Sequence, residues 1–273
     1  VGCSIVSPGC TNCYAMKMAA RLERMSEKVG QYRGLTKQVK GKPVWTGTLA
    51  FAGDKILEAP LRRSKQTTYF VNSMGDLFHE DTPLEWLRRV WMTMHVAHTK
   101  HGHIFQVLTK RPENIARMLG PRGIDWYAVE KPVPQPEPGI WLGTSVERQQ
   151  EADERREHLR NTPAAVRFVS YEPALGAVDW GGWEFINWLI SGGESGPGAR
   201  PSHPSWHRAA RDFCNANGVA YFFKQWGAWA PDTDLGWEYP KTERKTVEGF
   251  VMARIGKKSA GRLLDGREWN EMP

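Results

Sequence analysis

The chain has 273 residues, 40% of them hydrophobic and 25% charged, which is ordinary for a soluble globular protein. It has only four cysteines and no run of about 18 apolar residues, which excludes a disulfide framework and a membrane-spanning helix and favours a reducing cytoplasm. The formal net charge of +7 favours polyanionic partners, nucleic acid first.

Three of the four cysteines, Cys3, Cys10 and Cys13, lie in the first thirteen residues with the spacing C-x6-C-x2-C. Three thiolates on one loop suit zinc or an iron–sulfur cluster. A closed zinc site needs a fourth ligand nearby, and no further Cys or His occurs before His79. We therefore favour a cluster that keeps one iron open. Because the chain begins at Val1, we also expect a preceding segment.

Apolar, β-rich runs alternate along the chain with amphipathic helical stretches, which predicts βα units around a mainly parallel sheet. The first helix is expected at residues 14–25, and a short strand at 48–52. Six further strands are predicted at residues 67–73, 104–108, 140–144, 165–170, 187–191 and 219–224. The helices between them are expected at residues 84–99, 113–119, 147–160 and 205–217, and the proline-rich residues 131–139 form an irregular connector.

Six βα-type strands without a dinucleotide or Walker loop predict an α/β fold of the partial (β/α)6-barrel type. We expect residues 1–229 to form this barrel domain, and residues 230–273 to be a C-terminal extension rich in tryptophan and charge. Most of the thirteen tryptophans are expected in the core or at its rim, although tryptophan can also stack on bases.

Each predicted strand is followed by polar residues, and barrel enzymes assemble their sites where strands run into the following loops. Some of these residues, such as Asn72 and Ser145, are better explained as caps or turns. We expect the others to share one site with the cysteine loop. They are Asp76; Lys110 and Arg111; Glu172; the segment Gly192, Gly193, Glu194 and Ser195; and Lys224.

The glycine-rich segment is the most specific of these. Its glycines would let backbone N–H groups approach a ligand, and Glu194 could accept hydrogen bonds from an ammonium group or a ribose hydroxyl. The fourth cysteine, Cys214, falls near the end of a predicted helix, at the barrel face opposite the catalytic loops. We interpret it as a small buried residue rather than a fourth metal ligand.

A resemblance to a known family is carried by six segments: GCSIVSPGCTNCYA, NSMGDLFHE, LTKRPEN, SYEP, GGESGPGARP and FFKQWG. They resemble the phage-associated three-cysteine-motif proteins, a family of unknown function, over residues 1 to about 229. That family looks like a divergent relative of the radical S-adenosylmethionine enzymes, which carry a [4Fe-4S] cluster on three cysteines in a (β/α)6 partial barrel. The first cysteine gap here is three residues longer than the usual C-x3-C-x2-C.

The resemblance implies that Cys3, Cys10 and Cys13 bind three irons and that S-adenosylmethionine takes the fourth. With an electron donor, the reduced cluster would cleave S-adenosylmethionine to a 5′-deoxyadenosyl radical. The glycine-rich segment would bind this cofactor, and the catalytic candidates are Asp76, Lys110, Glu172 and Lys224. Lys110, Arg111 and Lys224 would face an anionic substrate, such as a nucleotide or DNA undergoing repair or modification.

Whether the enzyme is a lyase or a transferase stays open. Two alternatives remain. One is an iron–sulfur nucleic-acid-binding protein whose cluster is structural or redox-sensing, and the other is a zinc-stabilised binding module.

Overall fold

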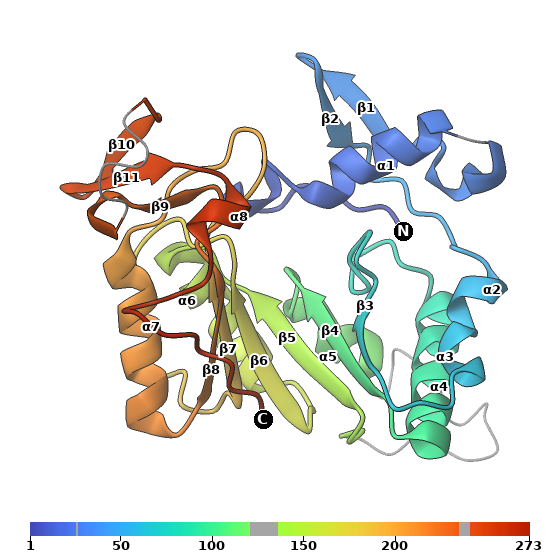
Figure 1. Cartoon of the computed structure of the whole chain (residues 1–273). Coiled ribbons are helices and arrows are strands. Elements are labelled where there is room, and N and C mark those ends of the chain that lie inside the picture. The colour runs from blue at the N-terminus through green and yellow to red at the C-terminus, as the bar shows by residue number, and fades with distance from the viewer. Residues whose placement is uncertain (26, 121–135, 235–240) are drawn as a thin grey trace. The chain divides into compact units, whose positions relative to one another are not determined.

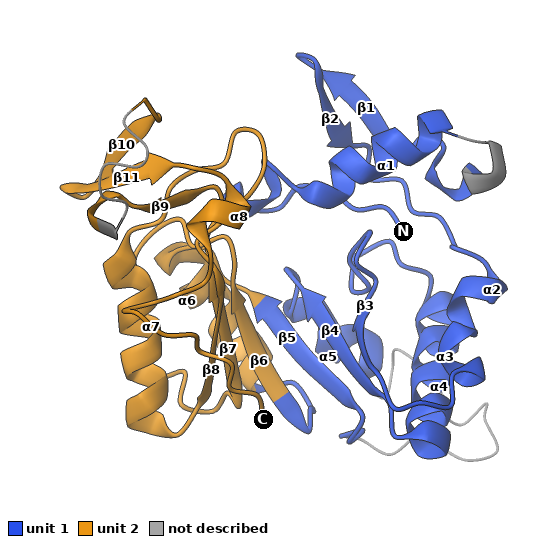
Figure 2. Cartoon of the chain, in the orientation of Figure 1, with its two compact units in different colours: residues 1–144, 161–166 blue, residues 145–160, 167–273 orange. Residues whose placement is uncertain are grey.

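The computed structural model describes residues 1–25, 27–120, 136–234 and 241–273 (Figure 1). The chain forms two compact units (Figure 2). Unit 1 comprises residues 1–144 and 161–166, and unit 2 comprises residues 145–160 and 167–273. The predicted connector at residues 131–139 lies for the most part outside the described residues.

The six predicted strands are all present and form one six-stranded sheet in chain order. They are β3 (Thr68–Val71), β4 (Ile104–Thr109), β5 (Ile140–Ser145), β6 (Val166–Tyr171), β7 (Trp188–Gly192) and β8 (Ala220–Gln225). The registered pairs are parallel in both units. A mixed α/β fold with the strand order of a partial barrel is therefore confirmed.

The first part of unit 1 is a short 3-10 turn, η1 (Pro8–Cys10), followed by α1 (Tyr14–Met25), whose bounds match the prediction. Helix α1 buries Ala15, Met16, Ala19 and Ala20 on one side, as the 3.6-residue period requires. After η2 (Glu27–Tyr32) comes an antiparallel hairpin of β1 (Thr36–Val39) and β2 (Lys42–Trp45). Leu35 and Trp45 complete this small core.

The sequence analysis missed this hairpin, because its strands are short, polar and largely exposed. The predicted strand at residues 48–52 is wrong. In this segment the Ala50 N–H donates to Val1 O, and the Val1 amino group donates to Ala50 O. A single pair of residues joined in this way is too short to form a β-strand.

Further helices accompany β3 and β4 in the rest of unit 1. They are α2 (Asp54–Leu57), α3 (Ala59–Arg62), α4 (Leu84–His101) and α5 (Glu113–Leu119). Helix α4 ends at Gly102, whose φ of 69° is left-handed, and it buries Leu87 and Trp91 against Phe105 and Val107 of β4. Among the described helices, none has both the length and the apolar character needed to cross a bilayer.

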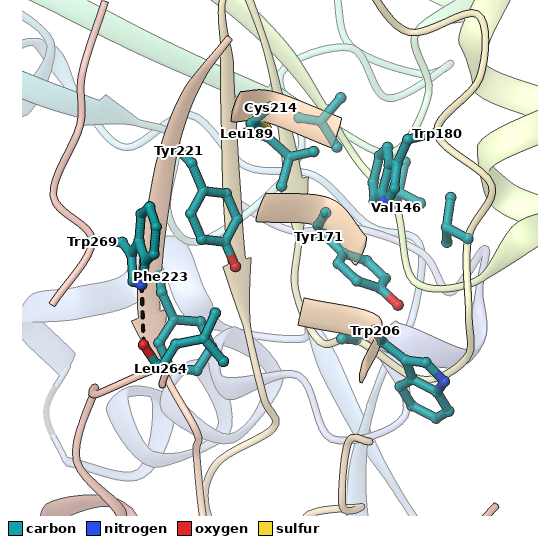
Figure 3. Packing of buried hydrophobic residues seen from close by; sticks show 14 of the residues in the cluster. Val146, Tyr171, Trp180, Leu189, Trp206, Cys214, Tyr221, Phe223, Leu264 and Trp269 are labelled. Atoms are coloured by element: carbon teal, nitrogen blue, oxygen red, sulfur yellow. Dashed lines mark hydrogen bonds between the residues drawn. The ribbon is translucent and has the colours of Figure 1, made fainter. Parts of the chain in front are cut away.

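Unit 2 surrounds β6–β8 with α6 (Gln149–Arg160) and α7 (Pro204–Asn217). A second sheet is antiparallel, in the order β10 (Arg244–Val247), β11 (Phe250–Arg254), β9 (Trp229–Pro231), and is accompanied by η4 (Asp232–Asp234) and α8 (Lys257–Ala260). Figure 3 shows Cys214 of α7 among Leu189, Tyr221 and other core side chains. Its full burial agrees with the predicted role of a small core residue.

Residues 262–273 return along β8. The Phe223 N–H donates to Trp269 O at 3.1 Å, and the Glu271 N–H donates to Tyr221 O at 3.1 Å. Trp269 in turn donates from its indole to Leu264 O (Figure 3). The predicted C-terminal extension, residues 230–273, thus contributes Met252, Leu264 and Trp269 to the core of unit 2.

The tryptophans are mainly core residues, as predicted. Two of the thirteen lie outside the described residues, and ten of the other eleven are buried. Because a stacking platform must be open to a base, the buried tryptophans do not supply one.

Candidate functional site

The cysteine loop of unit 1 is fastened to the loop that follows β3. The Gly2 N–H donates to Met74 O at 3.0 Å, and Gly2 forms a parallel bridge with Gly75. Gly2 has a φ of +96°, and a β-carbon there would lie 2.2 Å from Thr48 O, while one on Gly75 would lie 2.5 Å from Gly2 O. Two chain segments can therefore approach closely only because both positions are glycine, which brings Cys3 next to the loop of Asp76.

Cys10 and Cys13 are joined by consecutive turns. The Cys10 N–H donates to Ser7 O at 3.0 Å, and the Cys13 N–H donates to Cys10 O at 3.2 Å. Cys10 is buried, whereas Cys3 and Cys13 are partly buried against the small core of α1. All three are free thiols on one ordered loop.

The distances between the three sulfurs affect which metal centre they could bind. Among the described residues, the group of three ligating side chains with all ligand atoms within 4.8 Å of one another is His79, Glu80 and Asp81. The three cysteine sulfurs do not all lie within this distance of one another. Three sulfurs on one zinc, each at about 2.3 Å, would lie about 4 Å apart.

Arg111 is a buried cation beside the cysteine loop. Its Nη1 lies 3.7 Å from Cys3 Sγ and 3.1 Å from Asp76 Oδ2, and its Nε lies 2.7 Å from Glu80 Oε2. Burial raises the pKa of the Cys3 thiol to about 11, with Asp76 adding to the rise and Arg111 opposing it. The Arg111 guanidinium is therefore paired with the carboxylates of Asp76 and Glu80 and also donates to the sulfur of Cys3.

Asp76 links the loops after β3 and β4. Its buried carboxylate accepts hydrogen bonds from the Phe78 N–H, the Thr109 hydroxyl, the Lys110 N–H and Arg111. The structure thus brings together the predicted residues Asp76 and Lys110, through the backbone of Lys110. With so many donors, Asp76 acts first as the group that fixes Arg111 in place.

Ser4 and His79 complete this cluster, and sequence reasoning missed both. The Asp81 N–H donates to His79 Nδ1 at 3.2 Å, so Nε2 carries the ring proton and donates to Ser4 Oγ at 2.9 Å. Arg111 Nη2 also donates to Ser4 Oγ, at 2.6 Å. Since Ser4 Oγ accepts from both, its own O–H points to a third direction and can donate to an anion.

His79 is neutral at pH 7, because burial first, and the charge of Arg111 next, lower its pKa. Both ring nitrogens already have partners. The group of His79, Glu80 and Asp81 is therefore committed to the protein's own hydrogen bonds and is a poor metal site. The sequence signal for Ser4 was only its place next to Cys3.

In unit 2, the ends of β6, β7 and β8 bring together the predicted residues Glu172, Gly192 and Lys224. Lys224 Nζ lies 3.0 Å from Glu172 Oε2, which also accepts from the Ser170 hydroxyl at 3.3 Å. A β-carbon on Gly192 would lie 2.6 Å from Glu172 Oε1. The Lys224 side chain is 53% exposed, so its ammonium group can also reach a ligand.

The glycine-rich loop that follows β7 is held by contacts within the protein. Glu194 is buried, and its carboxylate accepts three hydrogen bonds of 2.7–2.9 Å from Arg200. A β-carbon on Gly193 would lie 2.0 Å from Trp226 O, so close packing already requires glycine there. Ser195 is exposed. The role of these residues in cofactor binding stays a prediction.

A buried histidine supports the end of β7. His207 of α7 lies 2.6 Å from Ser191 Oγ through Nδ1 and 2.9 Å from Ser202 Oγ through Nε2. Burial, and to a smaller extent His203, lowers the pKa of His207 to about 3. No local pattern indicated this pair of contacts, because serines and a histidine on a helix are common.

The predicted site residues thus fall into two groups, one in each unit. Cys3, Cys10, Cys13, Asp76 and Lys110 belong to unit 1, and Glu172, Gly192, Gly193, Glu194, Ser195 and Lys224 belong to unit 2.

Comparison with known proteins gives one match. The model of a family described as a protein of unknown function, DUF5131, matches residues 1–273. No curated protein and no solved structure matches the chain.

Proposed function

Because the chain belongs to the DUF5131 family, whose function is unknown, we propose from its own side chains that it is an iron–sulfur enzyme of the radical S-adenosylmethionine type. Its substrate is anionic, a nucleotide or DNA, and it works in the cytoplasm with a one-electron donor. Kinship with the radical enzymes, and the phage association, belong to this proposal. The observation that carries it is the loop of three free thiols fixed beside the buried Arg111.

The donor set fits a [4Fe-4S] cluster held by Cys3, Cys10 and Cys13. Thiolates are the ligands of such clusters, and each binds a different iron, so wide spacing of the sulfurs is expected. The fourth iron then remains for a ligand. A single zinc ion would need the three sulfurs to lie about 4 Å apart, so the cysteine side chains would have to turn toward one another to bind it. When bound, the cluster supplies the electron with which S-adenosylmethionine is cleaved.

The residues around the loop hold and orient the ligands. Arg111 donates to Cys3 Sγ and so would place positive charge beside this sulfur once it binds iron as a thiolate. The Ser4 hydroxyl, which accepts from Arg111 and His79, is set to donate to a carboxylate or another anionic group. Asp76 keeps Arg111 and the backbone of Lys110 in place.

In unit 2, Lys224 and Glu172 are proposed to contact the substrate. Lys224 is half-exposed and charged, so it suits a phosphate or carboxylate group. Glu172 orients it through a hydrogen bond of 3.0 Å. The glycine-rich segment at residues 192–195 is proposed to bind S-adenosylmethionine, through its backbone and the exposed Ser195.

Metal analysis of anaerobically purified protein tests the cluster. We expect about four irons and four sulfides per chain, an absorbance near 400 nm, and loss of both in Cys3→Ala, Cys10→Ala or Cys13→Ala. Cys214→Ala is the matched control, because Cys214 is buried in the core of unit 2, and it should keep the metal. Full iron in Cys10→Ala, or zinc in the wild-type protein, would contradict the assignment.

A second candidate is an iron–sulfur nucleic-acid-binding protein with a structural or redox-sensing cluster. It is favoured by one observation, that the carboxylates of Asp76 and Glu194 are both engaged by arginines of the protein. Reduction in the presence of S-adenosylmethionine separates the two. Release of 5′-deoxyadenosine supports the enzyme, and a reducible cluster without S-adenosylmethionine binding supports the second candidate.

A further inference from the structure

The positive charge of the chain is concentrated near its beginning. Residues 1–50 contain eight Lys or Arg and two Glu, a formal charge of +6, while the whole chain carries +7. The remaining 223 residues are therefore almost neutral, with a formal charge of +1. The excess charge belongs to α1, the segment that follows it and the β1–β2 hairpin, and not to the cysteine loop or the predicted strand ends.

These basic side chains lie on the outside of one substructure. Helix α1 packs its alanine-rich side against the hairpin, and the two elements stand together in unit 1 (Figure 1). The exposed basic residues are Lys17, Arg21 and Arg24 on α1, Arg33 after it, and Lys37, Lys40 and Lys42 on the hairpin. Because Trp45 packs toward α1, the register places Lys37 and Lys42 on the hairpin face that points away from α1. We call Lys37, Lys40 and Lys42 the basic face.

At the tip of the hairpin, Lys40 occupies a backbone conformation that is unfavourable for lysine. Val39 pairs with Lys42, so the turn has two residues, Lys40 and Gly41, with φ of +48° and +74°. Two positive φ values define a type I′ turn, which strongly prefers Asn, Asp or Gly at its first position. A lysine there is strained, and strained residues are often kept for function.

We propose that the basic face binds duplex DNA, with the β1–β2 hairpin entering the major groove. A two-stranded ribbon fits the major groove of B-form DNA, which is about 12 Å wide, and does not fit the deep, narrow groove of duplex RNA. Lysines at and beside the tip would contact phosphates. Val39, 41% exposed at the tip, offers an apolar contact for a thymine methyl.

This inference rests on the nucleic-acid part of the proposed function and not on the cluster. An acidic protein partner could also be attracted to the basic face. The hairpin favours DNA, because its exposed side chains are lysines around a narrow ribbon rather than a broad apolar surface.

The test is the anisotropy of a fluorescein-labelled 20-base-pair duplex, titrated with the full chain at several salt concentrations. The logarithm of the affinity should fall linearly with the logarithm of salt. Lys40→Asn should weaken binding by about tenfold near 0.1 M salt and lower the slope by about 1. It should leave the melting temperature equal or higher, because Asn suits the turn.

A triple variant, Lys37→Gln with Lys40→Asn and Lys42→Gln, should lower the slope by about 3. Lys258→Asn, at an exposed lysine of α8, removes the same charge elsewhere and should change binding little. The inference is overturned if the triple variant binds like the wild type, if Lys258→Asn weakens binding as much as Lys40→Asn, or if duplex RNA or anionic vesicles bind as tightly.

The measurement is made on both cluster-loaded and metal-free protein. Absence of DNA binding by iron-loaded protein overturns this inference and leaves the cluster assignment intact. DNA binding that depends on the hairpin, in a protein that contains no iron, supports this inference and contradicts the cluster assignment.

Discussion

The Arg111 guanidinium donates to Cys3 Sγ at 3.7 Å, although 108 residues separate the two in the sequence. The same side chain is paired with Asp76 and Glu80. The contact therefore connects a proposed cluster ligand to a set of charges whose balance can be altered from the surface, since the Glu80 side chain is 52% exposed.

This connection predicts an effect on the cluster potential. Glu80→Gln keeps a hydrogen-bond acceptor for Arg111 but removes a negative charge, which stabilises the more negative, reduced cluster. We expect the midpoint potential to rise by about 20–60 mV, up to a tenfold change in the reduced-to-oxidised ratio. Electron paramagnetic resonance during a redox titration measures it.

Asp81→Asn is the matched control for Glu80→Gln, because it removes the same charge from the next residue, which is 76% exposed. Its shift should be smaller. Equal shifts in the two variants would mean that general surface charge, and not the ion pair with Arg111, sets the potential.

The glycine bridge predicts that the cysteine loop is sensitive to a single methyl group. In Gly2→Ala, the new β-carbon would meet Thr48 O at 2.2 Å at a φ of +96°. We expect a loss of about 1–3 kcal/mol in the free energy of unfolding, together with reduced iron content. Gly30→Ala is the control, since a β-carbon there meets nothing within 4 Å, and it should retain its iron. Unchanged iron in Gly2→Ala would show that the bridge does not order the loop.

His207 predicts a loss of stability in acid. Its pKa is about 3 in the folded protein, and 6.5 is the ordinary value. The unfolded chain therefore takes up a proton first as the pH falls, and the free energy of unfolding should decrease between about pH 6.5 and 3, by at most about 1.4 kcal/mol per unit. Urea unfolding at several pH values measures this slope.

His207→Gln can keep hydrogen bonds to the two serines without taking up a proton, so its slope over this pH range should be shallower than that of the wild type. His158→Gln, at an exposed position of α6, serves as the control. A slope unchanged by His207→Gln would place the acid sensitivity in other groups.

Glu194 allows cofactor binding to be separated from folding. Glu194→Gln weakens the charge-assisted bonds to Arg200, so some stability should be lost in any case. If the loop also binds S-adenosylmethionine, calorimetry on the loaded protein should show affinity lower by about 10- to 100-fold. Reduced stability with unchanged affinity would assign Glu194 a structural role alone, and Glu184→Gln, at an exposed position, is the control.

Regular periodicity made much of the fold predictable. Helix α1 and the six parallel strands follow long apolar patterns, and their predicted bounds lie close to those in the structure. The β1–β2 hairpin was not found, because its exposed lysines give no alternation and its turn lacks the usual Asn-Gly signal. Tertiary contacts with α1 stabilise it instead.

The site was predictable only in part. Strand ends indicated Asp76, Glu172 and Lys224, since parallel strands bring their following loops to one edge. The pattern Gly192-Gly193-Glu194 has the same appearance whether it approaches a ligand or packs against Trp226. The contacts of Cys3 with Arg111 and of Ser4 with His79 depend on folding at long range, which local patterns do not encode.

The return of residues 269–271 along β8 has a consequence for behaviour in solution. β8 is the last strand of its sheet, and an open edge of this kind can recruit strands from other molecules. Here Trp269 and Glu271 occupy part of that edge with backbone hydrogen bonds. A chain shortened before residue 262 would present both a bare strand and uncovered aromatic side chains, and should self-associate, which light scattering would detect. We therefore expect the segment to limit self-association of the protein.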